Sequence, residues 1–225
     1  MLSDFLDLVY PRLCLLCTGH LSAGEELICI SCLYQLPKTG FMNNPENKMA
    51  KGFWGRVELQ YASAFLEFRK GNKVQELLHL LKYKRKKNLG IVMGKILGLQ
   101  LKENMTMLPD ALIPVPLHKE KKVLRGYNQS LMLAMGIKDI LNIPILELPL
   151  QRLTANETQT RKTRYARWIN VKEIFALEHP ELIENKHLLL VDDVYTTGAT
   201  LEACAQCLLE GQDVKVSAAA LACTV

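Results

Sequence analysis

The most informative segment of the sequence is VDDVYTTGAT, residues 191–200. It completes an apolar run, residues 187–191, of the kind found in buried strands of parallel sheets. After it, apolar residues recur with helical spacing until Gly211, which predicts a helix that presents one apolar face (Leu201, Cys204, Ala205, Leu208 and Leu209). The sequence therefore predicts a strand, an acidic pair, a turn of small residues and a helix. Ligands bind where such strands end in open α/β sheets.

The turn has the residue types that bind a phosphate. Gly198 permits a positive φ and a close approach of the backbone, and the amides of residues 197–200 would face an anion from a helix N-terminus. Hydroxyl donors are added by three threonines (Thr196, Thr197 and Thr200). Asp192 and Asp193 would repel phosphate but accept hydrogen bonds from sugar hydroxyls, so the layout suits a ribose 5-phosphate. The simpler interpretation is an aspartate N-cap followed by a polar turn, but the pattern is longer than a capping motif.

Four of the seven cysteines form two CxxC pairs near the N-terminus (Cys14, Cys17, Cys29 and Cys32). This spacing is typical of zinc ribbons, in which four thiolates hold one tetrahedral Zn²⁺ and leave no open position for catalysis. The alternatives are two disulfides, which a reducing cytosol disfavours, and a redox CxxC, which stands alone near a βαβ unit. We therefore expect a structural zinc. A further CxxC, Cys204 and Cys207, falls on the predicted helix and is interpreted as core packing.

Composition is that of an ordinary globular protein, with 225 residues, 49% hydrophobic and a net charge of +5. No apolar run reaches the roughly 18 residues of a membrane span. The N-terminal residues carry early acids and lack both a basic segment and a small-residue cleavage site, so they do not resemble a signal peptide. We expect a cytoplasmic protein with no membrane partner.

The order of predicted elements indicates two units. Residues 1–45 would form the small cysteine module, residues 40–52 a polar linker or loop, and residues 55–225 a larger domain. Strands are predicted at residues 61–65, 111–116, 143–150, 173–177, 187–191 and 214–222, and helices at residues 72–81, 89–101, 128–141 and from residue 201 onward. Residues 151–170 are polar and would form a long loop. The alternation predicts an α/β domain with a parallel sheet flanked by helices on both faces.

Three basic runs accompany the phosphate motif, at residues 82–87, 118–125 and 161–167. Most charge runs are solvated surface, but three of them around a phosphate site favour a pyrophosphate pocket or a polyanion as partner. Aromatic residues lie among the basic ones (Tyr83, Tyr127, Tyr165 and Trp168). Basic surfaces with stacking rings suit single-stranded nucleic acid, whereas the alternative for these rings is packing in the core.

Several motifs together resemble a known family. The stretch LLLVDDVYTTGAT resembles the 5-phosphoribosyl 1-pyrophosphate (PRPP) motif of type I phosphoribosyltransferases. Further stretches are DALIPVPLH (110–118), RGYNQS (125–130) and a polar segment with Arg152, Thr154, Gln159 and Arg164. With the double CxxC, they resemble the ComF family of competence-associated, phosphoribosyltransferase-like proteins. The resemblance implies a type I phosphoribosyltransferase fold behind a zinc module. It also implies uptake of single-stranded DNA in natural transformation, with a DNA-translocating helicase as partner.

The resemblance also assigns residues. Those implied in PRPP or phosphate binding are Asp192, Asp193, Thr196, Thr197, Gly198, Ala199, Thr200, Pro116 and His118. Those implied in catalysis, with Mg²⁺ accompanying PRPP, are Asp192, Asp193, Arg152 and Arg164. The acids would orient the ribose and offset positive charge on the sugar, and the arginines would close over the leaving pyrophosphate. Leu117 and His118 stand where related enzymes continue with an acid, a serine and a glycine, which weakens the case for ordinary catalysis.

Two main functions follow from these observations. The intact acids and the full T-T-G-x-T turn favour a phosphoribosyltransferase that makes or salvages a nucleotide. The altered pyrophosphate loop, the basic runs and the zinc module favour a non-catalytic module that binds single-stranded DNA and a partner in DNA uptake. A third interpretation is a structural adaptor that docks through the zinc module. Turnover of PRPP with a nucleobase would distinguish the first from the others.

Overall fold

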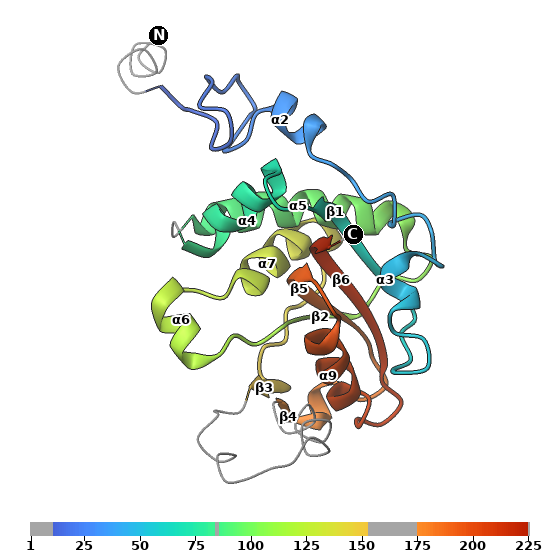
Figure 1. Ribbon diagram of the computed structural model, residues 1–225. Helices are drawn as coiled ribbons and strands as arrows, with labels where there is room; N and C mark the ends of the chain where they lie inside the picture. Colours follow the sequence, from blue (N-terminus) through green and yellow to red (C-terminus); the bar gives the residue numbers. More distant parts are fainter. Residues whose placement is uncertain (1–10, 84–85, 153–174, 225) are drawn as a thin grey trace, which may run out of the picture.

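The computed structural model describes residues 11–83, 86–152 and 175–224 (Figure 1). Its centre is a four-stranded parallel sheet in the order β1-β6-β5-β2. The strands are β1 (Ala62–Phe68), β2 (Ala111–Pro114), β5 (His187–Tyr195) and β6 (Lys215–Thr224). The predicted parallel α/β sheet is therefore confirmed, and β5, which carries the decisive motif, lies inside it between two neighbours.

Helices cover both faces of this sheet. On one face lie α4 (Lys73–Tyr83), α5 (Lys87–Asn104) and α7 (Gln129–Leu141), and on the other lies α9 (Ala199–Leu208). Alternate residues of β5 separate accordingly: Leu189 and Val191 pack with the first group, whereas Leu188 and Leu190 pack with α9. All four side chains are fully buried. This double coverage explains why the strand is continuously apolar rather than alternating.

The helices α5 and α7 pack with unusually close backbones. A Cβ added at Gly94 would lie 2.2 Å from the carbonyl oxygen of Leu133, and one at Gly136 would lie 2.1 Å from that of Ile91. Only glycine allows such an approach. Gly90 faces Met132, so the two helices begin at the same end. This end lies at the carboxyl edge of the sheet, where α7 reaches β5 through a hydrogen bond described below.

The predicted strand at residues 143–150 differs from the structure. Residues 143–149 form only an isolated bridge, between Ile145 and Leu112, because Pro144 and Pro149 lack the N–H that a strand needs. A small antiparallel sheet follows instead, from β3 (Leu150–Arg152) and β4 (Phe175–Leu177). A short 3-10 helix, η2 (Pro180–Leu182), leads from β4 toward β5.

The predicted linker at residues 40–52 contains the short helix α3 (Lys48–Lys51). Asn47 caps it by accepting a bond from the N–H of Ala50 at 3.0 Å, and donates its own amide to the carbonyl of Ala62 at 2.8 Å. Met49 and Phe53 are fully buried. The segment is therefore packed against the start of β1. The glycines and polar residues of this segment predicted a linker or loop. That pattern gives no sign that two apolar side chains anchor the segment in the core.

The cysteine-bearing residues pack on the domain through α2 (Ile30–Gln35). Cys14, Ile28, Cys32 and Leu36 belong to the same buried cluster as the leucines of α4 and α5. Lys73 of α4 donates to Oε1 of Gln35 at 2.7 Å. Among the helices of the described ranges, none has the length and apolar character needed to cross a membrane.

Candidate phosphoribosyl-binding site

The acid pair, Asp192 and Asp193, lies within β5 rather than after it, since the strand continues to Tyr195. Oδ1 of Asp192 accepts two hydrogen bonds, from the hydroxyl of Ser130 at 3.0 Å and from the N–H of Asp193 at 2.8 Å. Ser130 is the second residue of α7. The start of that helix therefore holds the first acid in one orientation.

The RGYNQS stretch supplies this contact and others around it. Asn128 caps α7, with its Oδ1 accepting from the N–H of Ser130 at 3.0 Å. Its amide also donates to the carbonyl of Val115 at 3.0 Å. The motif thus joins α7 to the loop after β2. The sequence analysis counted this stretch among those that carry the family resemblance, but only the fold shows that Ser130 contacts Asp192.

The second acid has a partner that the sequence did not indicate. Lys82, in the last turn of α4, places Nζ 3.1 Å from Oδ2 of Asp193. Both side chains are mostly covered, with 23% of Lys82 and 14% of Asp193 exposed. In the sequence, Lys82 is the first residue of a basic run and looks like its solvated neighbours. The one feature that distinguishes it is its position directly after Leu81, which is buried.

The environment changes the acidity of the pair. Burial, and then the negative charge of Asp193, raise the pKa of Asp192 to about 7. The N–H of Asp193, the hydroxyl of Ser130 and the charge of Lys82 act in the opposite direction. Asp192 therefore exchanges its proton near neutral pH when no ligand is bound.

Residues 196–200, the phosphate turn, lie between β5 and α9. Gly198 has φ 81°, as predicted, and a Cβ there would meet the Tyr195 ring at 2.8 Å. A small hollow of about 20 Å³ is lined by the turn, by residues 194–195 and 201, and by Asp192. Asp192, the first acid of the pair, and the phosphate turn therefore share one hollow, at the carboxyl edge of the sheet.

Arg56 is a second residue that the sequence did not single out. It forms an ion pair with Glu202 in the first turn of α9, and its Nη1 donates to the carbonyl of Gly52 at 2.9 Å. The same nitrogen lies 3.5 Å from the carbonyl of Thr197. Arg56 thus ties the segment after α3 to the phosphate turn. Its place in a polar stretch without a motif gave no signal of this role.

Other predicted site residues lie apart from this hollow. Pro116 and His118 precede α6 (Lys119–Arg125), are half-buried and do not line it. The guanidinium of Arg152 stacks over the ring of Phe175 at 5.4 Å, between β3 and β4. Arg164 lies outside the described residues, as does the basic run at residues 161–167.

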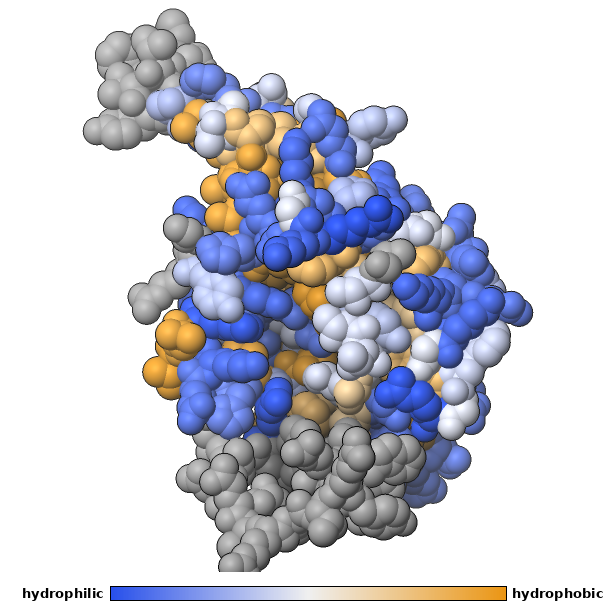
Figure 2. Space-filling model, in the orientation of Figure 1, coloured by the Kyte–Doolittle hydropathy of each residue, from blue (hydrophilic) through white to orange (hydrophobic). Residues whose placement is uncertain are grey.

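Two basic runs meet beside the site. The guanidinium of Arg125 lies 5.7 Å from the centre of the Tyr83 ring, and Nζ of Lys87 lies 6.0 Å from that of Tyr127. Tyr83 is 56% exposed, but Tyr127 is buried, with its hydroxyl donating to the carbonyl of Leu81. Tyr127 is therefore a packing residue and not a stacking platform. Figure 2 shows a largely hydrophilic surface here, interrupted by an apolar spot on α6.

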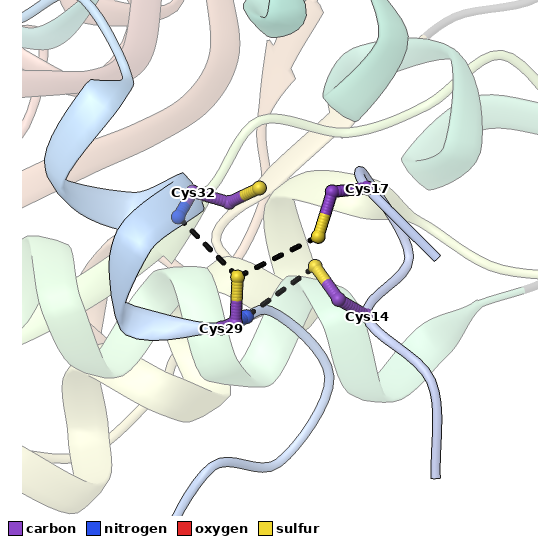
Figure 3. Close-up of side chains that lie close together, drawn as sticks. All are labelled: Cys14, Cys17, Cys29 and Cys32. Carbon is purple, nitrogen blue, oxygen red and sulfur yellow. Dashed lines mark hydrogen bonds between the residues drawn. The ribbon is translucent and has the colours of Figure 1, made fainter. Parts of the chain in front are cut away.

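The four N-terminal cysteines converge on one point (Figure 3). Their sulfurs all lie within 4.8 Å of one another, and Cys17 and Cys29 are 3.7 Å apart, too far for a disulfide. Burial opposes ionisation of Cys14, but N–H groups of Cys29 and Leu16 outweigh it and lower its pKa to about 6. The cluster can hold a metal ion. Cys204 and Cys207 are buried in the core, as predicted.

Comparisons with known proteins agree with this geometry. Residues 128–225 match the phosphoribosyl transferase domain. The chain is 33% identical over 137 residues to the DNA utilization protein YhgH of Escherichia coli O157:H7, covering 59% of this chain and 60% of that protein. It is 40% identical over 107 residues to the competence protein ComFC of Bacillus subtilis (strain 168), covering 47% and 41%. It is 26% identical over 198 residues to competence protein F of Haemophilus influenzae, covering 84% and 86%. Less than two thirds of the first two relatives is therefore matched.

Proposed function

We propose that this chain, whose residues 128–225 match the phosphoribosyl transferase domain, is a member of the ComF family and binds PRPP or a nucleotide 5′-phosphate at the acid pair and the phosphate turn. The observation that carries the proposal is that Asp192 lines the same hollow as residues 196–201. Carboxylate oxygens accept hydrogen bonds from vicinal hydroxyls, while backbone amides and threonine hydroxyls donate to a phosphate. A ribose 5-phosphate carries both groups: its vicinal hydroxyls would bind the carboxylates, and its phosphate would bind the turn.

The same arrangement supports transfer chemistry at the sugar. In a phosphoribosyl transfer, pyrophosphate leaves the anomeric carbon and positive charge develops on the ring. The acid pair would orient the ribose and stabilise that charge. Mg²⁺ would supply charge neutralisation on the pyrophosphate, but the residues present do not fit a bare ion on the acid pair, since Lys82 already contacts Asp193. The loop with Leu117 and His118 also lacks small residues whose amides would approach a pyrophosphate closely. We therefore propose binding of the phosphoribosyl group, and do not propose turnover.

We propose a cytoplasmic role for the chain, in DNA uptake or nucleotide salvage. We propose that Cys14, Cys17, Cys29 and Cys32 hold one structural Zn²⁺, because four converging sulfurs leave no open position. The proposed units are a zinc module of residues 1–45 and a phosphoribosyltransferase domain of residues 55–225. The competence and DNA utilization names of the relatives favour a role in DNA uptake. The resemblance to the ComF family adds a DNA-uptake helicase as the proposed protein partner.

Calorimetric titration with PRPP and with ribose 5-phosphate tests the proposal. Thr197→Val removes an exposed hydroxyl from the phosphate turn and should weaken binding by about 1–3 kcal/mol, the cost of a lost charged hydrogen bond. Thr106→Val, an exposed threonine after α5 at the opposite edge of the sheet, is the matched control. Gly198→Val is less informative, because its Cβ would meet the Tyr195 ring and strain the fold as well. Equal affinity of wild type and Thr197→Val would refute the site.

A second function is favoured by one specific observation. The described parts of two basic runs, around Lys87 and Arg125, meet beside the exposed ring of Tyr83. A positive surface with an accessible ring binds single-stranded nucleic acid without sequence preference. On this proposal the chain is a binding module of the DNA-uptake machinery, with the phosphate turn available to a DNA phosphate.

A further inference from the structure

The contact between Lys82 and Asp193 is a partly buried ion pair inside the proposed site. Nζ lies 3.1 Å from Oδ2, and less than a quarter of either side chain is exposed. The backbone that carries Lys82 is anchored on both sides. Leu81 is fully buried, and its carbonyl accepts the hydroxyl of the buried Tyr127. The lysine is thus held toward the acid pair by the packing of α4.

The hydrogen bonds of the acid pair leave one oxygen free on each carboxylate. Oδ1 of Asp192 accepts hydrogen bonds from Ser130 and from the N–H of Asp193, and Oδ2 of Asp193 forms the ion pair with Lys82. Within the described part of the chain, the other oxygen of each side chain has no hydrogen-bond partner. Two free acceptors on adjacent residues match the two vicinal hydroxyls of a ribose.

A divalent cation on the same pair would meet the ammonium group of Lys82. Mg²⁺ demands nearly octahedral oxygen ligands and holds its waters firmly. To bind both carboxylates it would have to displace Lys82 or lie within a few ångströms of another positive charge, which is unfavourable in a partly buried site.

We propose that Lys82 is the resident counter-ion of the acid pair, so that the site binds a phosphoribosyl group without a divalent cation. This inference rests on the proposed function and specifies how that site treats charge. The ammonium offsets the carboxylates, which would otherwise repel the phosphate of the same ligand. Lys82 is a positioning and charge-balancing residue that no sequence motif marks.

Ribose 5-phosphate is the probe, because it lacks the pyrophosphate through which PRPP itself carries Mg²⁺ in solution. We compare its affinity by calorimetry in EDTA and in excess Mg²⁺. Wild type should bind equally, within about threefold, in both conditions. Lys82→Met keeps the length of the side chain and removes its charge, so it should lose at least about tenfold in EDTA, and Mg²⁺ should restore part of this loss. Lys102→Met, an exposed lysine near the far end of α5, is the matched control and should behave as wild type.

The outcomes separate the inference from the proposed function. Binding by wild type only in the presence of Mg²⁺, or unchanged affinity of Lys82→Met in EDTA, would overturn the role of Lys82 and leave the site in place. No binding by wild type in either condition would overturn the proposed function itself. Thermal unfolding of Lys82→Met within a few degrees of wild type shows that the variant is folded. If it is not folded, Lys82→Arg keeps the charge and should restore both folding and binding in EDTA.

Discussion

Gly94 of α5 lies against the backbone of Leu133 in α7, so closely that a Cβ at Gly94 would be 2.2 Å from the Leu133 carbonyl oxygen. This approach sets how far α7 stands from α5 at the end where Ser130 meets Asp192. The contact is with backbone, which cannot rotate away as a side chain can. The position of Ser130 beside Asp192 therefore depends on a glycine outside the acid pair.

Gly94→Ala should destabilise the protein by about 2 kcal/mol, because overpacking of this kind outweighs the gain of about 1 kcal/mol in helix propensity. Denaturant unfolding measures the change. Leu99→Ala, at a half-exposed position of the same helix, is the control and should change stability by less than about 1 kcal/mol. A Gly94→Ala protein as stable as wild type would show that the helices stand further apart.

Asp192→Asn should alter stability in a pH-dependent way. The unfolded chain loses the proton of Asp192 near its ordinary pKa of 3.8, whereas the folded chain keeps it until the pKa of about 7. Between these values the folded state binds more protons, so the unfolding free energy falls as pH rises and is level above about 7. Asp192→Asn removes this loss. We expect it to gain on the order of 2 kcal/mol over wild type at pH 8 and little at pH 4.

Urea unfolding at several pH values between 4 and 8 tests this. Glu184→Gln neutralises an exposed carboxylate and should show no such trend. A stability difference between Asp192→Asn and wild type that is the same at every pH would contradict the raised pKa.

Removal of one cysteine should abolish metal binding. Elemental analysis of the purified protein should find about one zinc per chain, and Cys14→Ser should lose it, because three thiolates and a hydroxyl bind zinc far more weakly. Cys207→Ala alters the CxxC of α9 and should keep the full zinc content, since that residue lies in the core. Wild-type protein that is fully folded and free of metal would refute the zinc module.

Single-stranded DNA should bind to the basic surface with steep salt dependence. The logarithm of the affinity should fall with the logarithm of salt concentration, with a slope of roughly −0.7 for each phosphate contacted. Charge reversal of four exposed lysines (Lys86, Lys87, Lys121 and Lys122) should abolish binding without unfolding the chain. Fluorescence anisotropy measures both effects.

Reversal of Lys102 and Lys138, which are exposed near the far ends of α5 and α7, is the control for net charge and should preserve most of the affinity. Excess PRPP should compete if the phosphate turn holds a DNA phosphate, and should not if DNA uses only the outer basic surface. Affinity that does not vary with salt would show that these lysines are ordinary solvated surface residues with no role in DNA binding.

The sequence alone determined the features that depend on neighbouring residues. The apolar run of β5, the helical spacing of α9 and the positive φ of Gly198 follow from local sterics and from the periodic burial of side chains. The paired CxxC spacing likewise predicted sulfurs close enough to share a metal. Local patterns failed at residues 49–53, where long-range packing buries Met49 and Phe53. At residues 143–150 the predicted strand failed for a local reason, because two prolines lack the N–H that a strand needs.

Which charges and hydroxyls meet depends on the packing of helices against the sheet. Lys82 opens a basic run, and Ser130 lies 62 residues from Asp192 along the chain, yet both contact the acid pair. Tyr127 lies among basic residues and is nevertheless buried beneath them. Periodicity tells which face of a helix is apolar, but the partner of a polar side chain depends on how helices pack on the sheet. Contacts such as the one between Gly94 and Leu133 set that packing. They join segments that are far apart in the sequence, so no pattern of neighbouring residues predicts them.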